Sequence, residues 1–148
     1  MTQERLSLIE PALATQLASG IAEPQLRRSC STFLLPLLER TGLSLNPAVQ
    51  RACDILAAGG SDEASHREMQ HLAEILDERY FEISQSAEEG SRSDGDVLAA
   101  FAQARAAGAV AAALGPDPVF SAQEAAYEAH CAFADGSGVL NVLAEAME

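Results

Sequence analysis

The sequence predicts an all-α protein, and three of its features indicate this fold class. Alanine, the residue with the highest helix propensity, makes up about a fifth of the 148 residues. Valine, isoleucine and threonine are sparse and never alternate with polar residues over the length of a strand. Glycines recur between segments of helical periodicity. We therefore expect one domain over residues 1–148, either a multi-helix bundle or a short stack of helical hairpins, with about seven helices.

Start and stop signals divide the chain into these helices. A residue that caps a helix start, or a proline at the first helical position, follows each glycine-containing break. The glycines tolerate the left-handed backbone conformation in which many helices end. The expected helices are residues 3–19, 24–41, 47–58, 62–89, 95–114, 121–134 and 138–147.

The clearest of these helix starts lies at Ser121. In Ser121-Ala-Gln-Glu124 the hydroxyl and the carboxylate can each accept a hydrogen bond from a backbone N–H that the helix leaves free, which is a capping box. Phe120 is placed to act as the accompanying hydrophobic staple. Pro11 and Pro36 fall inside expected helices, where proline removes a hydrogen bond and clashes with the preceding turn. We expect kinks or breaks at both prolines.

The fourth expected helix has two opposite faces. Its apolar face repeats at steps of three and four residues, which predicts burial against the core. On the other face Glu74, Glu78 and Glu82 align at i, i+4 and i+8, and we call these three residues the acidic ridge. Ile75 and Phe81 lie on the flanks, and the pattern leaves open whether they are buried or form an interface. The apolar face comprises Met69, Leu72, Leu76, Tyr80, Ile83 and Ala87, and the polar face adds Arg67, His71, Gln85 and Glu89.

The fifth expected helix is apolar almost all round, and we expect it to be the central helix. Its small residues form a seam that would let a neighbouring helix approach closely, while Leu98, Phe101 and Leu114 supply bulk to the core. The preceding segment 90–96, GSRSDGD, is rich in turn residues and is a candidate flexible link between the first four and the last three helices. The seam comprises Ala100, Ala104, Gly108 and Ala111.

The charge balance is strongly acidic. The chain has 22 acidic and 9 basic side chains, every basic one an arginine, and a formal net charge of −13. A nucleic-acid-binding surface requires clustered basic residues, so we expect no nucleic-acid partner. The charge attracts basic proteins, which makes a basic protein the expected partner. The alternative is that the acidity only keeps the protein soluble.

We expect a cytoplasmic protein without a membrane span. Glu4 and Glu10 lie where a secretory signal would carry basic and then apolar residues. The most apolar stretch, residues 97–114, is mostly alanine and contains Arg105, so it would insert poorly. The cysteines are odd in number and widely spaced, as in proteins that keep their thiols reduced. They are Cys30, Cys53 and Cys131.

Candidate metal ligands and catalytic residues are few. Glu63 and His66 have the Glu-x-x-His spacing that places two metal ligands on adjacent turns of a helix, but a di-iron bundle needs two such motifs and the sequence has one. His130 and Cys131 are adjacent, so on a helix they point about 100° apart and the imidazole is not placed to activate the thiol. The alternative to a binding protein is a helical metalloprotein or metal-dependent enzyme that uses Glu63 and His66.

Other short motifs have structural explanations. Asp94-Gly-Asp96 lacks the oxygen-ligand series of a calcium loop, and helix capping accounts for Asp94. The doublet of Arg27 and Arg28 is expected to form ion pairs with neighbouring acids. The sequence has no glycine-rich phosphate loop, paired Cys-x-x-Cys or nucleophile-elbow motif. We therefore expect no cofactor, no intrinsic metal and no enzymatic turnover.

The stretch DVLAAFAQARAAGAVAAALGPDPVFSAQEAAYEAHCAF, from Asp96 to Phe133, resembles the alanine-rich paired helices of some small bacterial helical proteins grouped with toxin-immunity proteins. The resemblance covers residues 96–133. It implies a cytoplasmic, non-catalytic protein that binds and blocks a cognate toxin, and it transfers no individual functional residue. From the residues themselves, we expect the binding surface at the acidic ridge of Glu74, Glu78 and Glu82, with Phe81 as an apolar anchor beside it.

Overall fold

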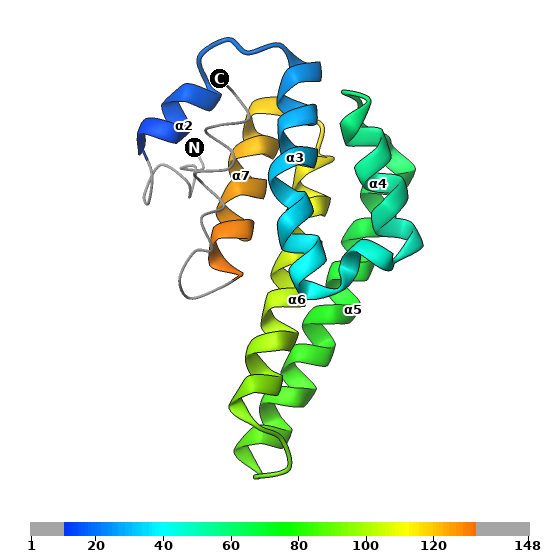
Figure 1. Cartoon of the computed structure of the whole chain (residues 1–148), viewed down its shortest axis with the longest axis vertical. Helices are drawn as coiled ribbons and strands as arrows, with labels where there is room; N and C mark the ends of the chain where they lie inside the picture. Colours follow the sequence, from blue (N-terminus) through cyan, green and yellow to red (C-terminus); the bar gives the residue numbers. More distant parts are fainter. Residues whose placement is uncertain (1–10, 133–148) are drawn as a thin grey trace.

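The computed structural model describes residues 11–132, and its helices are labelled in Figure 1. These residues contain no strand, which confirms the all-α prediction for the described part of the chain. They hold fewer helices than the seven expected, since the expected helix 138–147 and much of 3–19 lie outside them. The elements are α2 (Pro11–Leu17), α3 (Glu23–Thr41), the 3₁₀ turn η1 (Leu43–Leu45), α4 (Pro47–Ala57), α5 (Glu63–Glu88), α6 (Asp94–Ala113) and α7 (Pro118–Cys131).

α6 is the central helix of the bundle, as the sequence predicts. It packs most extensively against α5 and α7, and it also contacts α3 and α4. α5, α6 and α7 run in alternating directions, so each lies antiparallel to the next (Figure 1). The ends of α5 and α6 that meet at their shared turn extend beyond the other helices (Figure 1).

Two contacts define where this extension begins. Gln103 donates a hydrogen bond at 3.0 Å to the carbonyl oxygen of Thr41, the last residue of α3. Arg105 contacts Glu128, which lies in the last turn of α7, at 2.9 Å. Residues 78–102 lie beyond both contacts, and we call them the hairpin tip. The central position of α6 therefore applies to its second half, and its first half is covered mainly by α5.

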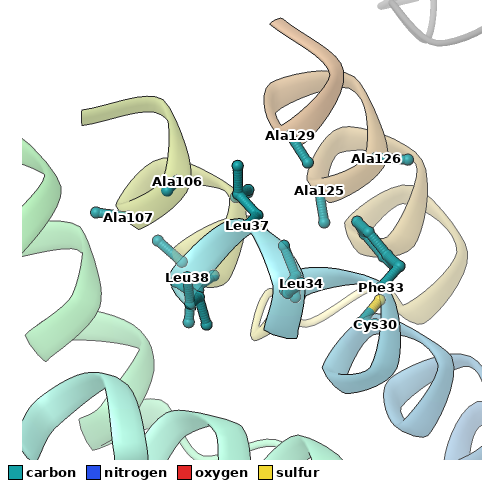
Figure 2. Close-up of a cluster of buried hydrophobic side chains, with 14 of the residues drawn as sticks. Cys30, Phe33, Leu34, Leu37, Leu38, Ala106, Ala107, Ala125, Ala126 and Ala129 are labelled. Atoms are coloured by element: carbon teal, nitrogen blue, oxygen red, sulfur yellow. The ribbon is translucent and has the colours of Figure 1, made fainter. Parts of the chain in front are cut away.

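The core joins large side chains of α3 to alanines of α6 and α7 (Figure 2). Phe33, Leu34, Leu37 and Leu38 of α3 each have an exposed fraction of 2% or less. Because an alanine side chain is a single carbon, α6 and α7 can approach α3 closely while the larger residues fill the space between them. The alanines drawn beside them in Figure 2 are Ala106, Ala107, Ala125, Ala126 and Ala129, all completely buried.

Side-chain caps fix the starts of α4, α5 and α6. Asn46 accepts hydrogen bonds from two backbone N–H groups of the first turn of α4. Asp62 accepts one from the N–H of Ser65 at the start of α5. At the start of α6 the cap is Ser93, which forms a reciprocal capping box with Asp96, and the expected cap Asp94 is instead the first residue of the helix.

The helix start expected at Ser121 is wrong. α7 begins at Pro118, where proline occupies a favoured first position, and the carboxylate of Asp117 accepts a hydrogen bond from the N–H of Phe120 at 3.1 Å. Ser121 is buried inside the first turns of α7, so the predicted capping box between Ser121 and Glu124 is not the cap of this helix. The signal that decides the start, an aspartate followed by proline, lies three residues earlier in the sequence.

Pro36 does not break α3, contrary to expectation. The helix is continuous from Glu23 to Thr41. Pro36 cannot donate to the carbonyl of Thr32, but both residues are exposed, so water can satisfy that carbonyl. At the other proline, Pro11, α2 begins, and the residues before it lie outside the described part of the chain.

A buried arginine joins α3 to the end of α6. Arg27 has an exposed fraction of 2%, and its guanidinium donates hydrogen bonds to the carbonyl oxygens of Ala113 at 2.7 Å and Gly115 at 2.8 Å. It also forms the expected ion pair, with Glu23 at 3.1 Å. Carbonyls at the end of a helix have no donor within that helix, so Arg27 supplies the donors that this end of α6 needs.

The close helix contact predicted at Gly108 is wrong. A Cβ atom at Gly108 would have Glu128 Oε2 as its nearest neighbour, at 3.9 Å, which is an ordinary contact distance. Ala100, Ala104 and Ala111 of the same seam are buried. Gly108 is half-buried and lines a groove together with Ala104 and Ala111, so no neighbouring helix closes over this position.

Alanine substitutions at two glycines are expected to act in opposite directions. Gly59 has a φ of +83°, and a Cβ there would lie 2.9 Å from Pro24 Cβ. Gly59→Ala should therefore lower the free energy of unfolding by about 1–3 kcal/mol. Gly108→Ala gains helix propensity without a clash and should raise it by about 0.5–1 kcal/mol. Urea unfolding followed by circular dichroism measures both, and a less stable Gly108→Ala protein would contradict the open surroundings of that residue.

Candidate functional site

The acidic ridge lies on the solvent side of α5, as the sequence predicts. Glu74, Glu78 and Glu82 are all exposed, whereas Met69 and Leu76 on the opposite face are buried. The three carboxylates recur at intervals of about one helical turn. Glu78 and Glu82 belong to the hairpin tip, so the ridge runs from the body of the bundle onto the part that extends from it.

Both apolar residues beside the ridge are exposed, which answers the question that the sequence leaves open. The exposed fraction is 46% for Ile75 and 68% for Phe81. Their positions on the helix place them on opposite sides of the ridge. The ring of Phe81 packs on that of Tyr80, with the centroids 5.5 Å apart. Exposed side chains of this size beside carboxylates are typical of protein-binding surfaces, where an apolar centre has a polar rim.

The two sides of the ridge have different neighbouring side chains. On the side of Ile75, a shallow depression of about 440 Å³ has two arginines, Arg79 and Arg92, in its lining. On the side of Phe81, the aromatic contacts continue onto α6. The remaining residues of the depression are Glu78, Glu82, Ile83 and Ser86.

The core positions expected for Leu98 and Phe101 are wrong. Leu98 is 64% exposed and Phe101 is only half-buried, because both lie in the hairpin tip, beyond the ends of α3 and α7. The ring of Phe101 packs edge-on against Tyr80, with the centroids 5.4 Å apart. The sequence pattern did not indicate that Leu98 and Phe101 lie at the surface. The signal that could have revealed them is length, since α5 has 26 residues and α7 only 14.

A three-membered ion network holds α5, α6 and α7 together at the base of the hairpin tip. Arg105 of α6 lies 2.9 Å from Glu128 of α7 and 3.1 Å from Asp77 of α5. The same guanidinium lies 5.5 Å from the ring centroid of Phe101. Two carboxylates and an aromatic face thus engage its charge. The sequence showed an arginine in an apolar helix but not its partners on two other helices.

Above this network, a groove runs between α5 and α7 over the small residues of α6. Two adjoining depressions, of about 320 and 360 Å³, share His66, Ala112 and Glu124. Gly108 lines the first and Phe120 the second. The groove therefore has an alanine and glycine floor with polar walls.

The structure does not bring Glu63 and His66 into a metal site. His66 lines the groove, whereas Glu63 is exposed and pairs with Arg67 at 3.7 Å. Within residues 11–132, no group of three or more histidine, cysteine, aspartate or glutamate side chains is placed to hold a metal ion. The metalloprotein alternative thus lacks a ligand set in the described part of the chain.

The cysteines lie on three different helices. Burial raises the pKa of the Cys30 thiol to about 12 and that of Cys53 to about 11. Both thiols therefore stay protonated at neutral pH, where only a thiolate would be a strong nucleophile. Cys131 ends α7 directly after His130, and both are half-buried.

Comparisons with protein-family models, curated proteins and solved structures find no match to this chain. Among the described residues, no helix combines the length and the apolar character that a membrane span requires. The geometry of the α5–α6 surface is therefore the basis for a functional hypothesis.

Proposed function

We propose that this chain is a non-enzymatic, acidic protein-binding module whose acidic ridge contacts a basic protein, and that in its narrowest form it is an immunity protein that blocks a cognate toxin. The observation that carries the proposal is Phe81, which is 68% exposed beside three exposed glutamates. Phe33 in the core is only 1% exposed, whereas the ring of Phe81 is open to solvent and available to a partner.

The shape and the charge of this surface support the same proposal. The hairpin tip extends from the bundle, so a partner can reach the ridge without meeting α3 or α7 (Figure 1). A chain with a formal net charge of −13 attracts basic proteins over distances of about one Debye length, roughly 10 Å at 0.1 M salt. Residues 96–133 resemble the alanine-rich helices of small proteins grouped with toxin-immunity proteins, and this resemblance is the reason for proposing the immunity role as the narrowest form of the function.

Affinity capture from the native host tests this proposal. The ridge variant carries Glu74→Gln, Glu78→Gln and Glu82→Gln, which removes three charges without removing side-chain volume. We expect the unmodified chain to capture a basic protein that is released as salt rises, and the ridge variant to lose most of it. A partner that persists unchanged in the ridge variant and in high salt would contradict the ridge as the binding site.

A matched control separates the site from the net charge. Glu39→Gln, Asp54→Asn and Glu63→Gln change the net charge equally at exposed positions outside the hairpin tip. This control variant should retain the partner. For the immunity role, the captured protein should stop bacterial growth when produced alone, and co-production of this chain should restore growth. A captured partner that does not stop growth would be consistent with the binding function but would contradict the immunity role.

A further inference from the structure

Four apolar side chains lie on the hairpin tip, and ring contacts join three of them across α5 and α6. Tyr80 packs on Phe81 at 5.5 Å and on Phe101 at 5.4 Å, which joins α5 to α6. Leu98 lies three residues before Phe101, on the same face of α6. We call Tyr80, Phe81, Leu98 and Phe101 the apolar patch. Phe81 and Leu98 are its most exposed members, at 68% and 64%.

The described helices leave this patch uncovered. α3 ends beside Gln103, and the last turn of α7 contacts Arg105, so neither helix reaches the level of Leu98. A further helix can pack its apolar face against two antiparallel helices that expose apolar side chains on one side. The patch is therefore a candidate contact surface for a helical partner segment.

The charges around the patch select the kind of helix. Asp94 lies four residues before Leu98, and helical spacing places the two on one face of α6. Arg105, whose guanidinium lies 5.5 Å from the ring centroid of Phe101, is already paired with Asp77 and Glu128. Over residues 78–102 there are six acidic side chains and two arginines. A second copy of this chain would thus bring like charges together, whereas a cationic segment would meet complementary ones.

We propose that the apolar patch is the binding site for a cationic amphipathic helix of the partner. This inference rests on the proposed function and extends it, since it adds a contact surface on α6 and states the form of the bound segment. The apolar face of the partner helix covers Phe81 and Leu98. Its lysines or arginines reach Asp94 on one side and the acidic ridge on the other.

Synthetic helical peptides test the inference directly. Each peptide has about 18 residues, five helical turns. The first carries leucines on one face and lysines on the other, the second replaces the lysines with glutamates, and the third replaces the leucines with alanines. Fluorescence anisotropy measures their binding to the full chain. We expect the first peptide to bind, the second not to bind, and the third to bind at least about tenfold more weakly than the first.

Two protein variants locate the binding site. Phe81→Ser with Leu98→Ser removes the two most exposed side chains of the patch. Because both side chains are exposed, we expect the variant to fold, and thermal unfolding checks this. This patch variant should bind the first peptide at least about tenfold more weakly than the unmodified chain. The control variant, Leu35→Ser with Leu45→Ser, alters side chains that are 49% and 80% exposed elsewhere and should bind as the unmodified chain does.

The outcomes distinguish this inference from the proposed function. If the patch variant binds the first peptide normally while the ridge variant does not, the apolar patch is not the binding site for the helix and the proposed function stands. If the ridge variant binds it normally in low salt, the proposed function fails. Two results would contradict a cationic helix as the ligand of the patch. One is binding of the second peptide as strong as that of the first, and the other is a dimer of the unmodified chain in sedimentation that the patch variant does not form.

Discussion

Arg27→Met is expected to lower the free energy of unfolding by about 2–4 kcal/mol, because it removes charged donors from buried carbonyl groups. Arg27 is 2% exposed and donates to Ala113 O and Gly115 O, which lie 86 and 88 residues away along the chain. Methionine fills a similar volume but donates nothing, so both carbonyls lose a partner. Urea unfolding followed by circular dichroism gives the change in free energy.

The neighbouring arginine provides the control for this substitution. Arg28 is exposed, and Arg28→Met should change the free energy of unfolding by no more than about 0.5 kcal/mol. Equal effects at the two positions would mean that the loss comes from charge or helix propensity. A loss at Arg27 alone would instead come from the hydrogen bonds that Arg27 makes at the end of α6.

Phe33→Ala is expected to have a similarly large effect, about 3–5 kcal/mol, because it leaves a cavity in a packed core. Phe33 is 1% exposed, and in Figure 2 it lies among side chains of α3 and α7. The alanines opposite it cannot move in to fill the space, since their helices already lie close. Phe81→Ala, at a residue that is 68% exposed, is the matched control and should change stability by no more than about 0.5 kcal/mol. A small effect at Phe33 would contradict the packing of α3 against α7.

Much of the helical framework could be predicted from local signals. The starts of α4 and α5 follow from the chemistry of Asn46 and Asp62, which accept hydrogen bonds from nearby backbone groups. Gly42 and Gly90 adopt positive φ angles where α3 and α5 end. At α7 two local signals competed, and the pair Asp117-Pro118 sets the start in place of Ser121.

Features that depend on distant parts of the chain could not be predicted in this way. A hydrophobic pattern shows which face of a helix is apolar, but not how far its neighbours extend to cover that face. Leu98 and Phe101 were therefore expected in the core, although α3 and α7 end before reaching them. The partners of Arg105 lie on two other helices, and no local spacing relates them. The solvent exposure of the acidic ridge was predicted correctly, because periodicity within one helix determines it.

Photo-crosslinking in the native host tests the central claim most directly. This claim is that the acidic ridge and the adjoining apolar patch contact a basic protein. A photoreactive phenylalanine analogue is placed at Phe81 in one strain and at the exposed Leu45, outside the hairpin tip, in another. We expect a crosslink to a basic protein from position 81, its loss in the ridge variant, and no crosslink to that protein from position 45. Crosslinks to the same protein from position 45 but not from position 81 would contradict the claim.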